Sequence, residues 1–215
     1  MVESSPGSIL EILYTGDPPS GYARYALRCL TPAQMKSISS TVVSQGIAAV
    51  VQLPADTYTD KPPADAGSRI LLLEDIQDPG NVGTLIRTAA AFNYSGIILT
   101  EKCADPFSPK CIQSTAGTAL SLWIRRTVAY LDLVGDLKKM GYILAAADLR
   151  GTQVPSLLQE PARLVLALGN EAAGLSESLL KKADYRVRIP IAGTKAESLN
   201  VAACGAICMY LSSLK

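Results

Sequence analysis

The stretch LVLALGNEAAGLS at residues 164–176 joins a continuous apolar run to a glycine-rich polar turn. A short apolar run that ends at such a turn is typical of a strand buried on both faces of a parallel sheet. Glu171 follows the run, between Gly169 and Gly174, where a carboxylate is poorly placed for core packing and well placed for a functional site. The alternative interpretation is a solvated turn in which Ser176 caps the next helix.

Similar apolar runs alternate with helix-like segments along most of the chain. Strands are predicted at 70–74, 96–100, 120–126, 142–148, 164–169 and 185–190, and helices at 81–92, 131–140, 176–182 and from 200 onward. Continuous apolar strands separated by helices predict an α/β fold with a mainly parallel sheet and helices on both faces. Because ligands of such sheets bind beyond the carboxyl ends of the strands, we expect functional residues at strand ends.

A second strand end carries DIQDPGNVG at residues 75–83 and leads into a helix that contains Arg87. Glycines allow a ligand to approach the backbone closely, and the amides at a helix start attract anions such as phosphate. Arg87 would add a guanidinium that can bind a phosphate through two hydrogen bonds. The segment matches neither the dinucleotide-binding glycine pattern nor the P-loop. A plain strand-to-helix turn with a solvent-facing arginine remains the alternative.

A third polar segment, IPIAGTKAESLN at residues 189–200, precedes the final helix. Ser198 and Asn200 are candidate site residues, although either of them would also serve as a cap of that helix. The helix sequence VAACGAICMYLSSLK is apolar nearly all round until its last turn. We therefore expect the helix to be buried on more than one side, in the core and against a partner subunit. An ordinary buried core helix is the alternative.

The composition restricts the class of protein. The chain has 215 residues, of which 48% are hydrophobic and 18% charged, as in folded and not in disordered proteins. No run reaches the roughly 18 to 20 apolar residues that span a bilayer, and the start MVESSPGSIL lacks the features of a signal peptide. These features predict a soluble, cytoplasmic protein without a membrane partner. Since the net charge is only +1, a polyanion would have to be bound by a local basic patch.

The absence of histidine excludes Ser-His-Asp and Cys-His catalysis and most zinc sites. The five cysteines contain no C-x-x-C pair, so we predict buried thiols and no disulfide framework. No metal centre is expected.

A stretch rich in proline and aspartate, PADTYTDKPPADAGS at residues 54–68, has no apolar periodicity and is typical of a linker. Upstream of it, a helix is predicted at 31–39 and a buried strand at 47–53, as in a small, partial α/β module. We therefore predict three parts, which are a module at 1–60, a linker at 61–68 and the main α/β domain at 69–215.

Taken in order, the three polar segments resemble the three motifs of the SpoU, or TrmH-type, RNA 2'-O-ribose methyltransferases of the SPOUT class. The matching segments are DPGNVGTLIRTAAAF at 78–92, LALGNEAAGLS at 166–176 and IPIAGTKAESLNVAA at 189–203, with STAGTAL at 114–120 similar to the serine-glycine segment of the family. Upstream, residues 30–54 are similar to the end of an L30-like RNA-binding domain, whose early part is shortened here. Asn93 stands where the family has glycine, and asparagine tolerates the left-handed conformation of a helix exit.

This resemblance implies a C-terminal trefoil knot with S-adenosylmethionine bound inside it in a bent form. Knots are rare, and the spacing of the segments alone does not predict one. By motif match, the backbone of Gly169, Ile189 and Leu199 would contact the adenosyl moiety. The polar catalytic region would consist of Asn81, Arg87, Glu171, Ser198 and Asn200. The resemblance also implies a homodimer with the final helix in its interface.

Methyl transfer to a ribose hydroxyl requires alignment of the reacting atoms and an acceptor for the hydroxyl proton. The family assigns activation of the hydroxyl to the residue at the position of Arg87. An arginine, with a pKa above about 12, is a poor base, so we interpret Arg87 as a phosphate anchor that also stabilises developing alkoxide charge. A phosphate oxygen, water or Glu171 would accept the proton. Asn81 and Asn200 would orient their neighbours, and Ser198 would contact cofactor or substrate.

The expected partner is RNA, and the L30-like segment favours rRNA over tRNA. Candidate RNA contacts are Arg125, Arg126, Lys181, Lys182, Arg186, Arg188 and Lys195, with Tyr22, Tyr25 and Tyr58 as candidates for base stacking. Other functions remain open, among them a tRNA ribose methyltransferase, a non-catalytic RNA-binding protein of the same fold and a flavodoxin-like nucleotide-binding domain. A base-nitrogen methyltransferase of the same class would have a similar donor pocket.

Overall fold

The computed structural model describes residues 6–39, 45–192 and 197–214, so the RNA-contact candidate Lys195 lies outside the described residues. The chain divides into two compact units, Met1–Ala55 and Asp56–Lys215. No helix in the described part of the chain is long and apolar enough to cross a membrane.

In its described residues, 6–39 and 45–55, the smaller unit is a three-stranded sheet with one α-helix. A short 3-10 helix, η1 (Pro6–Ser8), leads into β1 (Ile9–Tyr14), which lies between β2 (Ala26–Cys29), a parallel neighbour, and β3 (Ile47–Val51), an antiparallel one. Helix α1 (Pro32–Ile38) begins with a capping box, in which the side chains of Thr31 and Gln34 each accept a hydrogen bond from the other's backbone amide. The helix predicted at 31–39 and the strand predicted at 47–53 are present, but that strand, β3, is partly exposed and not buried as expected, with Val50 39% exposed. Strands β1 and β2 were not predicted.

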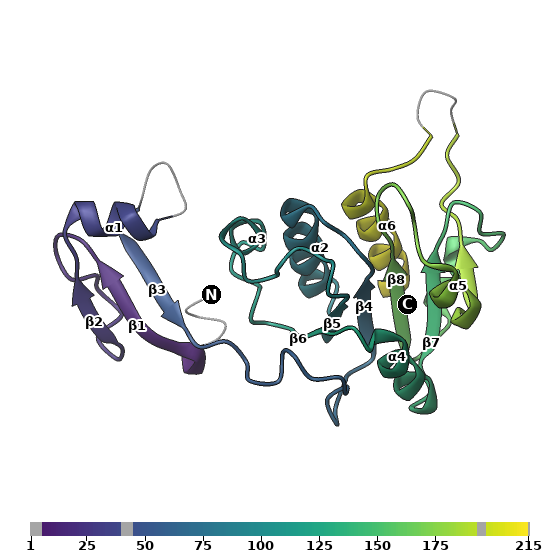
Figure 1. Ribbon diagram of the computed structural model, residues 1–215, viewed down its shortest axis with the longest axis horizontal. Coiled ribbons are helices and arrows are strands. Elements are labelled where there is room, and N and C mark those ends of the chain that lie inside the picture. The colour runs from purple at the N-terminus through teal and green to yellow at the C-terminus, as the bar shows by residue number, and fades with distance from the viewer. Residues whose placement is uncertain (1–5, 40–44, 193–196, 215) are drawn as a thin grey trace. The chain divides into compact units, whose positions relative to one another are not determined.

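The larger unit contains a six-stranded sheet in the order β6-β5-β4-β8-β7-β9, and all of its strand pairs are parallel (Figure 1). Its strands are β4 (Arg69–Leu73), β5 (Gly96–Leu99), β6 (Trp123–Arg126), β7 (Ile143–Ala147), β8 (Leu164–Leu168) and β9 (Tyr185–Val187). Its helices are α2 (Pro79–Ala91), α3 (Pro109–Ser114), α4 (Tyr130–Lys139), the 3-10 helix η2 (Pro155–Gln159), α5 (Glu177–Lys182) and α6 (Val201–Ser213).

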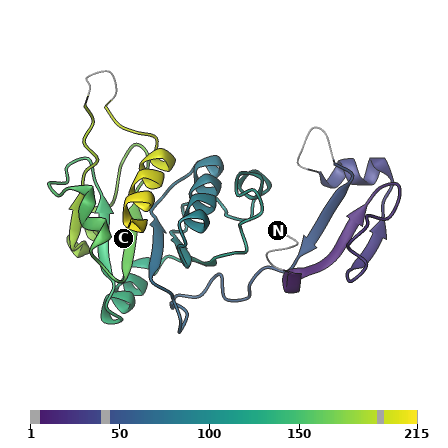
Figure 2. The ribbon, with the colours of Figure 1, turned by 180° about the vertical axis from the view of Figure 1, so that it is seen from behind.

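Helices cover both faces of this sheet. On one face α2, α6 and η2 pack on the strands, with Leu85, Leu158 and Met209 fully buried. Figure 2 shows α6 beside α2. On the other face α4 and α5 bury Leu133 and Leu179. The predicted α/β class, with a mainly parallel sheet between two helical layers, is therefore confirmed.

Local sequence explains how α2 and α6 are positioned. Asp78 is the N-cap of α2 and accepts a hydrogen bond of 2.8 Å from the Asn81 amide, which fixes where that helix begins. Just beyond α2, Asn93 has φ 57°, the left-handed conformation that the sequence analysis predicted there. A Cβ on Gly205 of α6 would lie 2.4 Å from a methyl group of Leu85 and 2.7 Å from one of Leu168. Only glycine permits α6 to pack so closely on α2 and β8.

Strand β9 is held on both of its edges. It pairs with β7 on one side, and Val187 forms a parallel bridge with Gln153 on the other. The Arg188 amide donates to the Gln153 carbonyl at 3.0 Å, and the Gln153 side-chain oxygen accepts from the Arg186 amide at 2.6 Å. A Cβ on Gly151 would lie 2.5 Å from the Arg186 carbonyl oxygen. The segment that leaves β7 therefore passes tightly around the far edge of β9.

Residues 56–67, which include most of the predicted linker, pack along β6 as part of the larger unit. The Arg126 amide donates to the Thr57 carbonyl at 2.8 Å, and the indole of Trp123 donates to the Ala66 carbonyl at 3.2 Å. The Arg125 guanidinium, with 3% of the residue exposed, bonds Asp56 at 2.6 Å and the Lys61 carbonyl at 3.0 Å. This contact covers the edge strand of the sheet. Because Arg125 is buried, it is not available to RNA, contrary to our expectation.

Replacement of Asp56 by Ala tests the energetic role of this contact. The variant leaves a buried guanidinium with an unsatisfied donor, so the free energy of unfolding should fall by about 1–3 kcal/mol in urea titrations. Glu160→Ala is the control, because that carboxylate is exposed and has no partner in the described part of the chain. The control should change stability by less than about 0.5 kcal/mol. Equal effects of the two variants would contradict a stabilising role for the Asp56–Arg125 pair.

Candidate functional site

A cavity of about 420 Å³ lies at the carboxyl ends of β7, β8 and β9. Four segments line it, at 147–150, 168–175, 187–191 and 198–204. Five of the predicted site residues are among its lining residues, namely Gly169, Glu171, Ile189, Ser198 and Leu199. The three residues expected to bind the adenosyl group thus share one cavity, although they come from distant parts of the chain.

The turn after β8, residues 169–175, is held by Asn170. Its side-chain oxygen accepts hydrogen bonds of 3.0 Å from the amides of both Ala172 and Ala173, and its amide group donates to the Asp75 carbonyl at 2.9 Å. The backbone of Asn170 also pairs with that of Gly174. The turn folds back so closely that a Cβ on Gly169 would lie 2.3 Å from the carbonyl carbon of Gly174. Gly169 is therefore required by the shape of the turn.

A buried carboxylate fixes the far end of the same turn. Glu74 is 4% exposed, and its side chain accepts hydrogen bonds from the Tyr130 hydroxyl at 2.5 Å and from the Ser176 amide at 2.7 Å. Burial, together with the hydrogen bond to Glu74, raises the pKa of Tyr130 to about 12. Ser176 also caps α5 by accepting from the Leu179 amide at 3.2 Å. Ser176 therefore caps α5, as one interpretation of the sequence proposed, although the turn before it also lines the cavity.

Three predicted catalytic residues form a hydrogen-bonded chain beside the cavity. The Asn81 amide group donates to Glu171 Oε1 at 2.7 Å, and the Asn200 amide group donates to Asn81 Oδ1 at 3.1 Å. The three residues belong to three different segments, so the chain of bonds joins the start of α2, the turn after β8 and the start of α6. Asn200 also caps α6, because its side-chain oxygen accepts from the Ala202 amide at 2.9 Å.

The remaining predicted catalytic residues are placed differently. Ser198 is exposed and lines the cavity. Arg87 is exposed on α2, does not line the cavity and has no hydrogen-bond or ion-pair partner among the described residues. Arg87 lies six positions after Asn81, which corresponds to about 9 Å along a helix at 1.5 Å per residue. The structure therefore joins Asn81, Glu171 and Asn200 but leaves Arg87 apart from them.

The cavity also includes a wall that the sequence analysis missed, formed by Asp148 and Arg150 after β7. Asp148 Oδ2 accepts hydrogen bonds from the Arg186 guanidinium at 2.6 and 3.1 Å, and Oδ1 accepts from the Arg150 amide at 3.0 Å. Burial raises the pKa of the Asp148 carboxyl, but these hydrogen bonds outweigh burial and hold the pKa below the ordinary 3.8. The polar residues directly after the apolar run YILAAA at 142–147 were the feature of the sequence that could have predicted this wall.

Asp148→Asn should lower the free energy of unfolding at neutral pH by about 1–3 kcal/mol, because the variant loses the ion pair with Arg186. The aspartate side chain of that pair is only 10% exposed. The folded-state pKa is depressed, so the stabilisation is fully present above the unfolded-state pKa of 3.8 and is lost as pH falls through the folded-state value. Urea titrations should therefore show that the free energies of unfolding of wild type and variant differ by a constant amount above about pH 5. This difference should become smaller only in strong acid. A difference that disappears near neutral pH would contradict this assignment.

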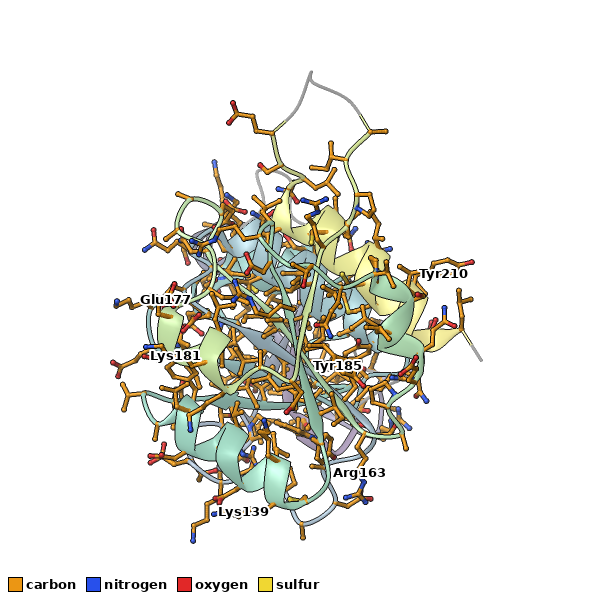
Figure 3. The ribbon with its side chains drawn as sticks, turned by 90° about the vertical axis from the view of Figure 1, so that its right-hand side faces the viewer. Lys139, Arg163, Glu177, Lys181, Tyr185 and Tyr210 are labelled. Carbon is orange, nitrogen blue, oxygen red and sulfur yellow. The ribbon has the colours of Figure 1, made fainter. Side chains whose placement is uncertain are left out.

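Most of the RNA-contact candidates have other bonds or are widely dispersed. Arg126 donates to the carbonyls of Glu101 and Cys103, and Arg186 is bound to Asp148. Lys181 and Lys182 are exposed on α5, where Figure 3 shows Lys181 pointing away from the sheet. Arg188 is exposed and lines the cavity. The tyrosines Tyr22 and Tyr25 are partly buried, whereas Tyr58 is 60% exposed.

A parallel α/β sheet with a cavity beyond its strand ends, walled by glycine turns and a polar cluster, is typical of α/β proteins that bind a small ligand at this edge of the sheet. Comparison with known proteins gives the family. A profile of the SpoU rRNA methylase family matches residues 68–210. The chain belongs to this family.

Among curated relatives, the 23S rRNA (guanosine(2553)-2'-O)-methyltransferase RlmP of Bacillus subtilis is 32% identical over 212 residues, which cover 96% of this chain and 81% of the relative. The 23S rRNA (uridine(2479)-2'-O)-methyltransferase of Streptomyces viridochromogenes is 30% identical over 213 residues, which cover 93% of this chain and 74% of the relative.

Two solved structures are similar over nearly the whole chain. The SpoU methyltransferase AviRb of Streptomyces viridochromogenes in complex with AdoMet superimposes with a TM-score of 0.84 at 27% identity, covering 99% of this chain and 86% of AviRb. The AdoMet-bound rRNA methyltransferase of Sinorhizobium meliloti gives a TM-score of 0.82 at 26% identity, covering 98% and 82% of the two chains.

Proposed function

We propose that this protein is an S-adenosylmethionine-dependent RNA 2'-O-ribose methyltransferase that acts on rRNA. The observation that carries the proposal is the convergence of three family motifs, in which Asn81, Glu171 and Asn200 form one hydrogen-bonded chain beside the cavity. The curated relatives described above, named as 23S rRNA 2'-O-methyltransferases, align with more than nine-tenths of this chain, the smaller unit included. A ribosomal RNA substrate would place the enzyme in the cytoplasm.

The cavity fits an adenosyl compound in size and in chemistry. Its volume of about 420 Å³ is within the range of about 300–1,000 Å³ typical of small-molecule sites. Leu168, Ile189, Ile191 and Val201 give it apolar walls for a purine ring. The backbone at Gly169, Ile189 and Leu199 would supply the hydrogen bonds of the adenosyl moiety, and the Glu171 carboxylate would lie near the positive sulfonium. S-adenosylmethionine, when bound, supplies an activated methyl group to an oxygen nucleophile.

The residues of the chain would align the target hydroxyl and accept its proton. Glu171 is held by Asn81 through Oε1 only, so Oε2 has no hydrogen-bond partner among the described residues. This arrangement favours Glu171 over water or a phosphate oxygen as the proton acceptor. Asn200 orients Asn81, which in turn orients the carboxylate. Ser198, which also lines the cavity, would contact the cofactor or the ribose. No group of acidic or cysteine side chains in the described residues is arranged to hold a metal ion.

Arg87, with its unpaired guanidinium, would bind the phosphate next to the target ribose and stabilise negative charge that develops on the ribose oxygen. This role explains why Arg87 has no partner in the described part of the chain, since its partner would be the RNA. The same role requires the RNA backbone to lie along the exposed face of α2.

Arg87→Ala tests this assignment. The variant should reduce kcat for methyl transfer by at least about a hundredfold, the loss typical of a missing charge-stabilising group. Its affinity for S-adenosylhomocysteine, measured by isothermal titration calorimetry, should stay unchanged because Arg87 does not line the cavity. Arg163→Ala is the matched control, because it removes an arginine at the amino end of the sheet, away from the cavity (Figure 3). An Arg87→Ala enzyme with normal turnover would remove Arg87 from the mechanism.

The substrate itself is tested with a labelled methyl donor and total RNA from a strain that lacks the enzyme. Our proposal predicts label in rRNA, in a nucleoside methylated on the ribose. Label in tRNA would identify the alternative substrate, and label on a base nitrogen would identify a different reaction of the same donor. Saturable RNA binding without any label would identify a non-catalytic RNA-binding protein.

We further propose that the larger unit has the trefoil knot of its family. The observation in support is the tight passage of the segment after β7 around β9, through the Gln153–Val187 bridge. We also propose that the smaller unit is the predicted L30-like RNA-binding module and the larger unit the catalytic domain, with the boundary after Ala55 instead of after residue 60, because residues 56–60 belong to the larger unit. The bonds of residues 56–67 to β6 would make the linker a fixed support of the catalytic domain.

Helix α6 is proposed as the centre of a homodimer interface. Ala203, Ile207, Tyr210 and Leu214 recur at helical spacing and are all exposed, Tyr210 by 51% and Ile207 by 38%. Figure 3 shows Tyr210 pointing outward from α6. An exposed apolar stripe on a helix whose other sides are buried is typical of an isologous interface.

Ile207→Arg should disrupt this dimer, because it places an unpaired charge at the centre of the apolar stripe. Light scattering coupled to gel filtration should give a mass near twice 22.7 kDa for the wild type and near 22.7 kDa for the variant. Val128→Arg is the control, since Val128 is 69% exposed and does not belong to α6. A wild-type monomer, or a variant that remains dimeric, would contradict the interface.

A further inference from the structure

The charged residues that line the cavity differ in whether their side chains form hydrogen bonds or ion pairs. Both oxygens of Asp148 accept hydrogen bonds, from Arg186 and from the Arg150 amide. Glu171 accepts one from Asn81. On the basic side, the Arg150 guanidinium lies 3.9 Å from the carboxylate of Glu177. Arg188 alone among these charged lining groups has no side-chain hydrogen bond or ion pair within the described residues. Arg188 is thus the one charged lining residue whose side chain is unpaired among the described residues.

The backbone that carries Arg188 is held on two sides. The Arg188 amide donates to the Gln153 carbonyl at 3.0 Å, and the carbonyl of the preceding residue, Val187, accepts from the Asp148 amide at 3.0 Å. Val187 is 1% exposed and is anchored in the sheet. The next residue, Ile189, also lines the cavity. The starting point of the Arg188 side chain is therefore fixed at the cavity wall before any ligand binds, which reduces the entropic cost of binding.

The proposed ligand carries the complementary charge. S-adenosylmethionine has an apolar purine, a sulfonium and an amino-acid tail, and the α-carboxylate of that tail is its only anionic group. A guanidinium is the side chain that matches a carboxylate best, through two parallel hydrogen bonds. Asp148 is already neutralised by Arg186 and does not compete for Arg188. An unpaired arginine at the wall and a carboxylate on the ligand therefore complement each other.

We propose that Arg188 binds the α-carboxylate of S-adenosylmethionine and so selects ligands with a complete amino-acid tail. This role rests on the proposed function of the cavity. It makes Arg188 a cofactor-binding residue, in place of the RNA contact considered from the sequence. Arg150 is the less suitable candidate, because its guanidinium lies 3.9 Å from the Glu177 carboxylate, whereas that of Arg188 forms no ion pair among the described residues.

The test compares two ligands that differ only in the carboxylate, S-adenosylhomocysteine and its decarboxylated analogue, by calorimetry without RNA. For the wild type, the decarboxylated analogue should bind about tenfold more weakly, the factor that corresponds to about 1.4 kcal/mol for a charge-assisted hydrogen bond in a partly exposed site. Arg188→Ala should bind S-adenosylhomocysteine about tenfold more weakly than the wild type, with less than about a twofold change for the analogue. Arg188→Lys, which keeps the charge but loses the paired geometry, should lie between the two.

Two variants serve as controls. Arg150→Ala alters the same cavity, and Lys139→Ala removes a positive charge at the amino end of the sheet (Figure 3). Both should retain the tenfold preference for the carboxylate, and thermal unfolding should show that all variants fold. If Arg188→Ala also retains that preference, or if only Arg150→Ala loses it, the assignment of Arg188 is wrong. If Arg188→Ala loses affinity for RNA but keeps the preference for the ligand with a carboxylate, Arg188 contacts RNA and not the cofactor. If neither ligand binds the wild type, the proposed function of the cavity fails instead.

Discussion

The turn after β8 is the constraint on which the candidate site depends. It reverses within seven residues at the carboxyl end of a central, fully buried strand, and Gly169 has to lack a side chain because Gly174 lies against it. Asn170 satisfies the backbone amides of the turn from inside, and the buried Glu74 carboxylate holds its far end at Ser176. With both ends fixed, the turn can present Glu171 to Asn81 and the cavity at the same time.

Short polar side chains link this turn to the rest of the site. Asn81 and Asn200 both lie at helix starts, and each forms part of the bonded chain that ends at Glu171. The close contact of Gly205 with Leu85 and Leu168 brings α6, and with it Asn200, next to α2. Core packing and site geometry are therefore coupled, since the helices that bury the sheet also set the distances between the polar groups.

Much of this arrangement could be predicted from the sequence. The apolar runs predicted the strands of the parallel sheet, and the glycine turns predicted the side of the sheet at which a ligand would bind. The burial of Arg125 under Asp56 could not be predicted, because Asp56 lies in a polar stretch typical of a solvated linker, and Arg125, 69 residues further along, follows an apolar run and meets it only in the fold. The β7 wall was missed for a similar reason, since the role of Asp148 depends on Arg186, 38 residues further along the chain. Weak strands such as β2, with every residue exposed, carry no apolar pattern to recognise.

The proposed function requires that the turn after β8 and the cavity-lining residues before α6 together enclose an adenosyl ligand. The most direct measurement is an experimental structure of the protein with S-adenosylhomocysteine bound. The adenosine should lie between residues 169–175 and the lining residues Ile189 and Leu199, with the sulfur of the ligand facing Glu171. A ligand bound elsewhere on the larger unit, or one that leaves this cavity filled by protein side chains, would contradict the proposed function.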